Sequence, residues 1–149
     1  MAGKAGVKMS MELEICPEPG FLRVGVRGEF SLEEARQTFL ELLEAVALHK
    51  VRKVLFDGRA LAGEPMTMER FYYGEFAARA VAESFRRGDV SRSTQFGYVL
   101  KEPVLDPERF SETVAVNRGM FVKAFDNLPD ALGWLGILPA NKPEAGNGK

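Results

Sequence analysis

The chain opens with two stretches in which apolar and polar residues alternate. The first runs from Ser10 to Cys16 and the second from Phe21 to Arg27. A period of two is typical of strands that bury one face. The segment between them, 17–20, reads Pro-Glu-Pro-Gly, which favours a turn. The two stretches therefore predict an antiparallel hairpin at the start of the fold.

The next segment has the spacing of an amphipathic helix. Apolar residues recur at every third or fourth position from Leu32 to Val46, with acidic and amide side chains between them. Ser31 and Glu34 match the S-x-x-E capping box, in which each side chain accepts a hydrogen bond from the backbone of the other residue. We therefore expect a helix that begins at Ser31 and packs its apolar face on the sheet.

Apolar runs and helical segments then alternate along the rest of the chain. The pattern predicts strands at 51–56, 95–100 and 120–125, and helices at 66–87, 106–118 and 128–135. Asp57-Gly58 is expected to end the first of these strands in a turn, and Thr67 to cap the long helix. Asp106-Pro107 is expected to start the helix that follows the next strand.

The order of predicted elements, β-β-α-β-α-β-α-β-α, indicates an α/β fold. Strands that alternate with helices imply crossover connections, and so a mixed, largely parallel sheet with the opening hairpin as an antiparallel edge. At 149 residues the chain has the length of one domain with a sizeable core. We expect that domain at 10–138, with a disordered segment at 1–9 and a flexible tail at 139–149.

Composition excludes several classes of protein. With 20 basic and 21 acidic residues, the chain lacks the strong positive charge typical of nucleic-acid-binding domains. No apolar run approaches the roughly 20 residues of a membrane-spanning helix, and no apolar segment of a secretory signal follows the start. A single cysteine cannot form an intramolecular disulfide. We therefore expect a cytoplasmic protein with no nucleic-acid partner and no membrane span.

Residues with obvious chemistry are few. Cys16 and His49 are the only cysteine and the only histidine, so the chain lacks the usual nitrogen and sulfur ligands of a metal site. The sequence contains no glycine-rich phosphate loop, and its spacing suggests no nucleophile with a neighbouring base. We expect no metal, no cofactor and no enzymatic activity; the alternative is an enzyme whose residues do not converge in the sequence.

Several local motifs resemble the SpoIIAA-like branch of the STAS domains, the sulfate-transporter and anti-sigma-factor-antagonist group. They are the strand 54–57 (Val-Leu-Phe-Asp) after a long helix, Asn117-Arg118-Gly119 before the last strand, and Phe125-Asp126 followed by 131–135 (Ala-Leu-Gly-Trp-Leu). The resemblance covers Met11 to Leu135. It implies a mixed sheet with helices packed on it, and a non-enzymatic, regulatory role in binding another protein.

The resemblance also has two further implications. In signalling members of the family, an aspartate precedes a phosphorylatable serine at the start of the helix after the third strand. The region from Asp57 to Thr67 lacks that Asp-Ser pair, and only these two residues stand near the corresponding places. Related SpoIIAA-like proteins share their architecture with lipid-carrier domains, which implies a small apolar ligand as an alternative to a protein partner.

Four polar residues are candidates for contact with a partner or ligand. Asp57 and Arg59 follow a predicted strand, where ligands gather in open α/β sheets; the alternative is that Asp57 is a simple turn residue. Thr67 is a candidate phosphate acceptor, because a helix N-terminus stabilises negative charge; the alternative is a helix cap. Arg118 either contacts a phosphate or an acidic partner, or lies at a solvated helix end.

The long helix at 66–87 is apolar on more than one side. One stripe is expected to face the sheet, and it comprises Phe71, Gly74, Ala78, Val81, Ala82 and Phe85. A second stripe comprises Tyr72, Tyr73, Phe76, Ala77 and Ala80. The second stripe suits an interface or a pocket wall, because tyrosine is apolar along its ring and polar at its tip. We expect a homodimer or another protein partner there, or an apolar ligand; the alternative is that both stripes belong to the core.

Overall fold

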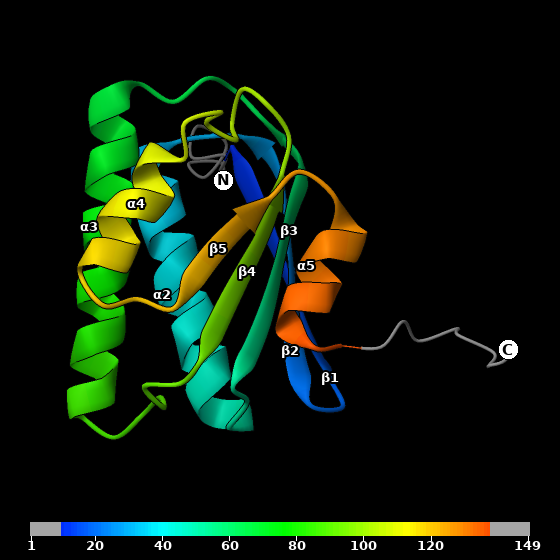
Figure 1. Ribbon diagram of the computed structural model, residues 1–149, viewed down its shortest axis with the longest axis vertical. Helices are drawn as coiled ribbons and strands as arrows, with labels where there is room; N and C mark the ends of the chain where they lie inside the picture. The colour runs from blue at the N-terminus through cyan, green and yellow to red at the C-terminus, as the bar shows by residue number, and fades with distance from the viewer. Residues whose placement is uncertain (1–9, 138–149) are drawn as a thin grey trace, which may run out of the picture.

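The computed structural model describes residues 10–137, which form a five-stranded sheet with helices on both faces (Figure 1). The elements are β1 (Met11–Glu18), β2 (Phe21–Glu29), α2 (Leu32–His49), β3 (Lys53–Ala62), α3 (Thr67–Arg86), β4 (Gln95–Leu100), α4 (Phe110–Asn117), β5 (Val122–Phe125) and α5 (Leu128–Leu135). The segments predicted to be disordered or flexible, and the predicted domain end at 138, lie outside the described residues.

The strands lie in the sheet in the order in which they occur in the chain, from β1 to β5. β1 and β2 are antiparallel, and every other neighbouring pair is parallel. The predicted fold class, a mixed and largely parallel sheet with an N-terminal hairpin, is therefore confirmed. The three crossover helices α2, α3 and α4 lie on one face, as right-handed connections require when each strand is added on the same side. α5 covers the other face.

The hairpin is longer than the alternation alone predicts. Residues 17–18 pair with 21–22, so only Pro19 and Gly20 form the turn. Proline suits the first central position of a tight turn, and Gly20 adopts the positive φ of 85° that the second position of a type II turn requires.

α2 begins where the sequence predicts, but only half of the capping box forms. The Ser31 hydroxyl accepts a hydrogen bond from the Glu34 backbone N–H at 3.4 Å. The Glu34 carboxylate accepts instead from the backbone N–H groups of Ser10 and Met11, at 3.2 and 2.7 Å. This side chain therefore joins the first turn of α2 to the start of β1, a contact between segments more than twenty residues apart.

The prediction that Asp57-Gly58 forms a turn is wrong, because β3 continues to Ala62. The strand has hydrogen-bonded neighbours on both sides, and these hold the Asp-Gly pair in extended backbone. The register between β2 and β3 shifts here: Gly25 pairs with Asp57, and Arg27 pairs with Ala60. One extra residue of β3 is therefore accommodated in a bulge.

Two predicted helix starts are also wrong. Met66, not Thr67, precedes α3, and the Glu69 carboxylate accepts a hydrogen bond from the Met66 N–H at 2.8 Å. α4 begins at Phe110, four residues after Asp106. The Asp106 carboxylate accepts from the Phe110 N–H at 2.9 Å within a turn, and the positive φ of Arg109 separates that turn from the helix.

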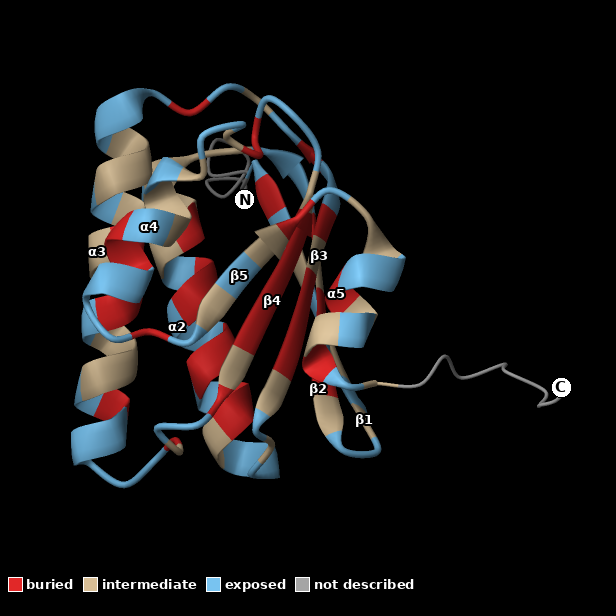
Figure 2. Cartoon of the chain, in the orientation of Figure 1, coloured by how far each residue is buried: buried red, intermediate tan, exposed pale blue. Residues whose placement is uncertain are grey.

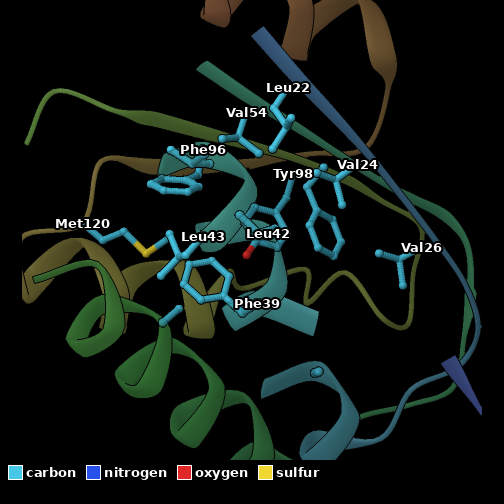
Figure 3. Packing of buried hydrophobic residues seen from close by; sticks show 14 of the residues in the cluster. Leu22, Val24, Val26, Phe39, Leu42, Leu43, Val54, Phe96, Tyr98 and Met120 are labelled. Carbon is cyan, nitrogen blue, oxygen red and sulfur yellow. The ribbon is translucent and has the colours of Figure 1, made fainter. Parts of the chain in front are cut away.

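Two hydrophobic layers pack on the sheet, one on each face; Figure 2 shows buried residues in red on the strands and on the helices that cover them. The larger layer lies between the sheet and α2, α3 and α4, and Figure 3 shows part of it. The smaller layer lies under α5, where Leu55 and Val99 meet Leu135. The continuous apolar run predicted for β3 suits this arrangement, because Val54 and Phe56 face the larger layer and Leu55 faces the smaller one.

α3 uses its apolar stripes differently from the prediction. Tyr73 and Ala77, from the second stripe, pack into the larger core. Phe71, from the first stripe, stacks on Phe110 near the start of α4, with ring centroids 6.4 Å apart. A Cβ atom on Gly74 would lie 2.5 Å from the backbone oxygen of Ser111 in α4. The prediction that the first stripe faces the sheet is therefore wrong for Phe71 and Gly74, because α4 lies against that side of α3.

The close contact at Gly74 gives a stability prediction. We expect Gly74→Ala to lower the free energy of unfolding by about 1–3 kcal/mol through overpacking, although alanine favours helices by ~1 kcal/mol over glycine. Gly133→Ala in α5 is the matched control, because a Cβ there has no atom within 4 Å; it should raise the free energy of unfolding by up to about 1 kcal/mol. Urea denaturation measures both values, and a stabilised Gly74→Ala protein would contradict the prediction.

Candidate functional site

An apolar cavity of about 110 Å³ lies between α3, α4 and the sheet. Its wall includes Phe56, Leu61, Ala77, Leu100, Ala115 and Val122. The helices contribute small side chains here, and a longer side chain at Ala77 or Ala115 would extend into the space. α3 also has its backbone neighbours in α2 and α4 rather than in the sheet, and it is the outermost helix of this layer (Figure 1). The cavity therefore exists because small residues of α3 face the sheet across a distance that their side chains do not fill.

Two tyrosines place a polar group in this apolar wall. The hydroxyl oxygens of Tyr73 on α3 and Tyr98 on β4 are 2.6 Å apart and hydrogen-bonded. The Tyr98 ring stacks on Phe56 with centroids 4.3 Å apart, and the Tyr73 ring meets the edge of Phe39 at 6.2 Å. Tyr98 extends from β4 into the core (Figure 3). These aromatic contacts hold both hydroxyls in fixed positions.

Both tyrosines stay protonated at neutral pH. Burial raises the pKa of Tyr73 above that of an ordinary phenol, and the hydrogen bond with Tyr98 opposes this only in part. Burial also raises the pKa of Tyr98, and Tyr73 raises it further. Tyr73 as a whole residue is partly exposed, whereas its phenol group is buried. The pair is therefore a neutral hydrogen-bonding group rather than an acid or a base.

The connection between β4 and α4 is tied to α3 at the edge of the cavity. Arg70 on α3 donates hydrogen bonds to the carbonyl oxygens of Val104 and Pro103, at 2.9 and 2.8 Å. Arg70 and Val104 both line the cavity. Further along, the Glu112 carboxylate accepts from the Ala124 N–H at 3.0 Å and joins α4 to β5. Polar side chains at the rim are thus used to hold the surrounding elements.

Asp57 and Arg59 lie on the opposite face of the sheet from the cavity. Phe56 lines the cavity, and its neighbour Asp57 lines an open groove together with Arg59, Glu12 and Arg27. Arg59 donates two side-chain hydrogen bonds to the Asp57 carboxylate, at 2.9 and 2.8 Å, and these lower the pKa of Asp57. Glu12 and Arg27 form a second ion pair at 2.7 Å. These four charges are therefore paired with one another, and Glu14 and Lys101 also line the groove.

Three of the other candidates lie near Phe71, on the side of α3 that packs against α4. Tyr72 is exposed and contacts the Phe71 ring with centroids 5.7 Å apart. The Arg118 guanidinium lies 5.6 Å from the same ring and 3.6 Å from a Glu75 carboxylate oxygen. Thr67 is exposed in the first turn of α3.

Phe76 occupies a different position. It packs against the edge of the core, with the Arg36 guanidinium 5.7 Å from its ring centroid. The predicted residues therefore fall in separate places: Tyr73 in the cavity, Asp57 and Arg59 on the far face of the sheet, and Tyr72 and Arg118 beside Phe71. The structure therefore does not bring the predicted contact residues together into one site.

Tyr98 is the residue of the cavity that sequence reasoning missed. It lies in a strand whose neighbours are apolar, Phe96 and Val99 among them. A buried tyrosine normally needs a partner for its hydroxyl. A tyrosine in an apolar strand therefore indicates a buried hydrogen bond, but the sequence does not show which residue on another element is its partner.

Within residues 10–137, no helix is both long enough and apolar enough to cross a membrane. The same range holds no cluster of three or more histidine, cysteine, aspartate or glutamate residues placed to bind a metal ion.

Similarity to known proteins is confined to structure, since no family model and no curated protein matches the chain. An anti-sigma factor antagonist from Mycobacterium paratuberculosis aligns with 85% of this chain and 95% of its own, with a TM-score of 0.54 and 17% identity. This chain has the SpoIIAA-like fold. An uncharacterised protein of the DUF3478 family with a SpoIIAA-like fold, from Shewanella loihica PV-4, covers 85% of this chain and 94% of its own, with a TM-score of 0.46 and 17% identity. The SpoIIAA-like resemblance noted in the sequence is confirmed as a likeness of fold.

The buried tyrosine pair predicts a specific loss of stability at alkaline pH. In the unfolded chain both phenols ionise above about pH 10, whereas in the folded protein their raised pKa values keep them protonated. The free energy of unfolding should therefore fall as pH rises above 10, by up to about 1.4 kcal/mol per pH unit for each phenol.

Urea denaturation between pH 8 and pH 11 tests this expectation. The Tyr73→Phe/Tyr98→Phe double variant should show a shallower fall above pH 10 than the unmodified protein. Tyr72→Phe is the control, because Tyr72 is exposed, and it should follow the unmodified protein. Equal slopes in all three proteins would show that the pair does not titrate as described.

Proposed function

We propose that this protein is a non-enzymatic binding module that holds a small apolar ligand in the cavity between α3 and the sheet. The observation that supports this function is the cavity of about 110 Å³ within an apolar wall. The space is partly open to solvent, and a concave, mostly apolar hollow of this kind is the usual setting of a small-molecule site. Tyr73 and Ala77 turn towards this space, and that favours a ligand over a partner subunit for this part of the helix.

The size of the cavity limits the ligand. An apolar cavity of about 150 Å³ in another protein stays dry and binds benzene. The space beside Tyr73 and Tyr98 is somewhat smaller, so it suits one ring or a short chain. A sterol or a diacyl lipid has several times this volume and does not fit the described conformation.

The wall of the cavity supports binding rather than catalysis. No histidine, cysteine, lysine or aspartate is among its described lining residues. Its two carboxylates are used in the fold, since Glu69 accepts from the Met66 N–H and Glu112 accepts from the Ala124 N–H. The tyrosines have raised pKa values, which makes them poor bases at neutral pH.

Filling the cavity gives the decisive test. In Ala77→Leu the added carbon atoms should occupy the space, raise the free energy of unfolding by about 0.5–2 kcal/mol and abolish the binding of benzene. Benzene should raise the melting temperature of the unmodified protein, because a ligand that binds only the folded state stabilises it. Thermal denaturation with and without benzene measures both effects.

Ala131→Leu is the matched control for this experiment. Ala131 is fully buried in the layer under α5, away from the cavity. The larger side chain should overpack that layer and cost about 1–3 kcal/mol, while the response to benzene should remain. A benzene response that is absent from the unmodified protein, or unchanged in Ala77→Leu, would refute the proposed function.

A regulatory, protein-binding role is the second candidate. It is supported by an exposed apolar surface, here called the Phe71 patch, which consists of Phe71 with Met68, Tyr72 and Phe110. The exposed fractions are 52% for Met68, 41% for Tyr72 and 36% for Phe110. Arg118 lies at the edge of this patch, and Thr67 precedes it in the first turn of α3. One protein of similar fold is an anti-sigma factor antagonist, which is consistent with a protein partner, including a second copy of this chain.

The oligomeric state tests the Phe71 patch. If the patch forms a homodimer, Tyr72→Glu should raise the dimer dissociation constant by about tenfold or more, because a buried aromatic anchor is replaced by a charge. Leu48→Glu is the control, since Leu48 is 74% exposed at the end of α2 and outside the patch. Light scattering over a concentration series measures both variants. A wild-type protein that is monomeric at every concentration would exclude the homodimer.

A further inference from the structure

The tyrosine pair in the cavity has one hydrogen-bond donor more than it uses. Each phenol carries one hydroxyl proton and can also accept a hydrogen bond. The bond between Tyr73 and Tyr98 uses one of the two protons. Among residues 10–137, neither hydroxyl makes a hydrogen bond to any other residue. One hydroxyl proton of the pair therefore has no acceptor among residues 10–137.

This spare donor is buried at the wall of the cavity. Tyr98 is only 7% exposed, and both tyrosines line the space. Their rings are held by Phe56 and Phe39, so neither hydroxyl can turn to solvent without breaking an aromatic contact. An unsatisfied buried donor costs free energy, and an acceptor brought in by a ligand removes that cost.

The surroundings of the pair determine the charge of that ligand. Most of the wall is apolar, and a buried ion without a partner is strongly disfavoured. The cation at the rim, Arg70, already donates to the carbonyl oxygens of Pro103 and Val104. Glu69 and Glu112 also line the space and would repel an anion. A neutral molecule therefore suits the cavity better than a carboxylate.

We infer that the cavity binds a neutral molecule of about one ring that carries a single acceptor oxygen, and that the spare hydroxyl proton of the Tyr73–Tyr98 pair donates to this oxygen. The inference rests on the proposed ligand-binding function and adds to it the chemical class of the ligand. Either hydroxyl can take the outward role, since either can donate within the pair.

Two probes of equal shape test the inference. Cyclohexanone has an acceptor oxygen where methylenecyclohexane has a carbon, and dissociation constants for both follow from methyl NMR titrations. Removing both hydroxyls in Tyr73→Phe/Tyr98→Phe should reduce the preference for cyclohexanone over methylenecyclohexane by about 3- to 10-fold, the range expected for one hydrogen bond. Tyr72→Phe, which alters a hydroxyl outside the cavity, should leave that preference unchanged.

A second measurement uses the unmodified protein and does not depend on the folding of the variant. With ¹³Cζ-labelled tyrosine, cyclohexanone should shift the signals of Tyr73 and Tyr98 more strongly than methylenecyclohexane does. If both probes bind but the double variant keeps the same preference, or both probes shift the signals equally, the inference is wrong and the ligand-binding function stands. If neither probe binds, and benzene does not bind either, the proposed function itself is wrong.

Discussion

The position of α3 controls how the larger core layer is filled. At Gly74 the absence of a side chain lets α3 approach the backbone of α4 at Ser111. α3 is thereby packed against its neighbouring helices, and only its side chains reach the sheet. A long residue such as Tyr73 spans that gap, and a short one such as Ala77 does not. The cavity follows from this alternation of long and short side chains on a helix that is set away from the sheet.

The tyrosine pair is the polar link across this apolar gap. Tyr73 comes from the helix and Tyr98 from the sheet, so their hydrogen bond joins the two layers at the place where packing is least complete. The same pair is a candidate contact for a ligand. The SpoIIAA-like fold does not determine such a role, because one fold can carry many functions and the residues of the site decide among them.

The sequence predicted part of the candidate site. The spacing of one stripe predicts Tyr73 at an interface or a pocket wall, and Tyr73 lines the cavity. The Asp-Gly pair predicts that the strand ends at Asp57, because Asp-Gly commonly forms turns, but the neighbouring strands hold Asp57 in extended backbone. A period of two counted from Phe56 would have placed Asp57 on the far face of the sheet. Tyr98 was missed, since its partner lies 25 residues away on another element.

Local patterns in the sequence are enough to predict the order and type of the elements, because alternation, helical spacing and caps such as Ser31 are signals that neighbouring residues can satisfy. The same patterns predict the fold class, since strands that alternate with helices leave few connections open. The folded structure was needed to show which stripe of α3 meets α4, which groups bind the Glu34 carboxylate and how much space remains beside Tyr98. These outcomes depend on the packing of side chains from segments far apart in the chain, and no local pattern records the distances between them.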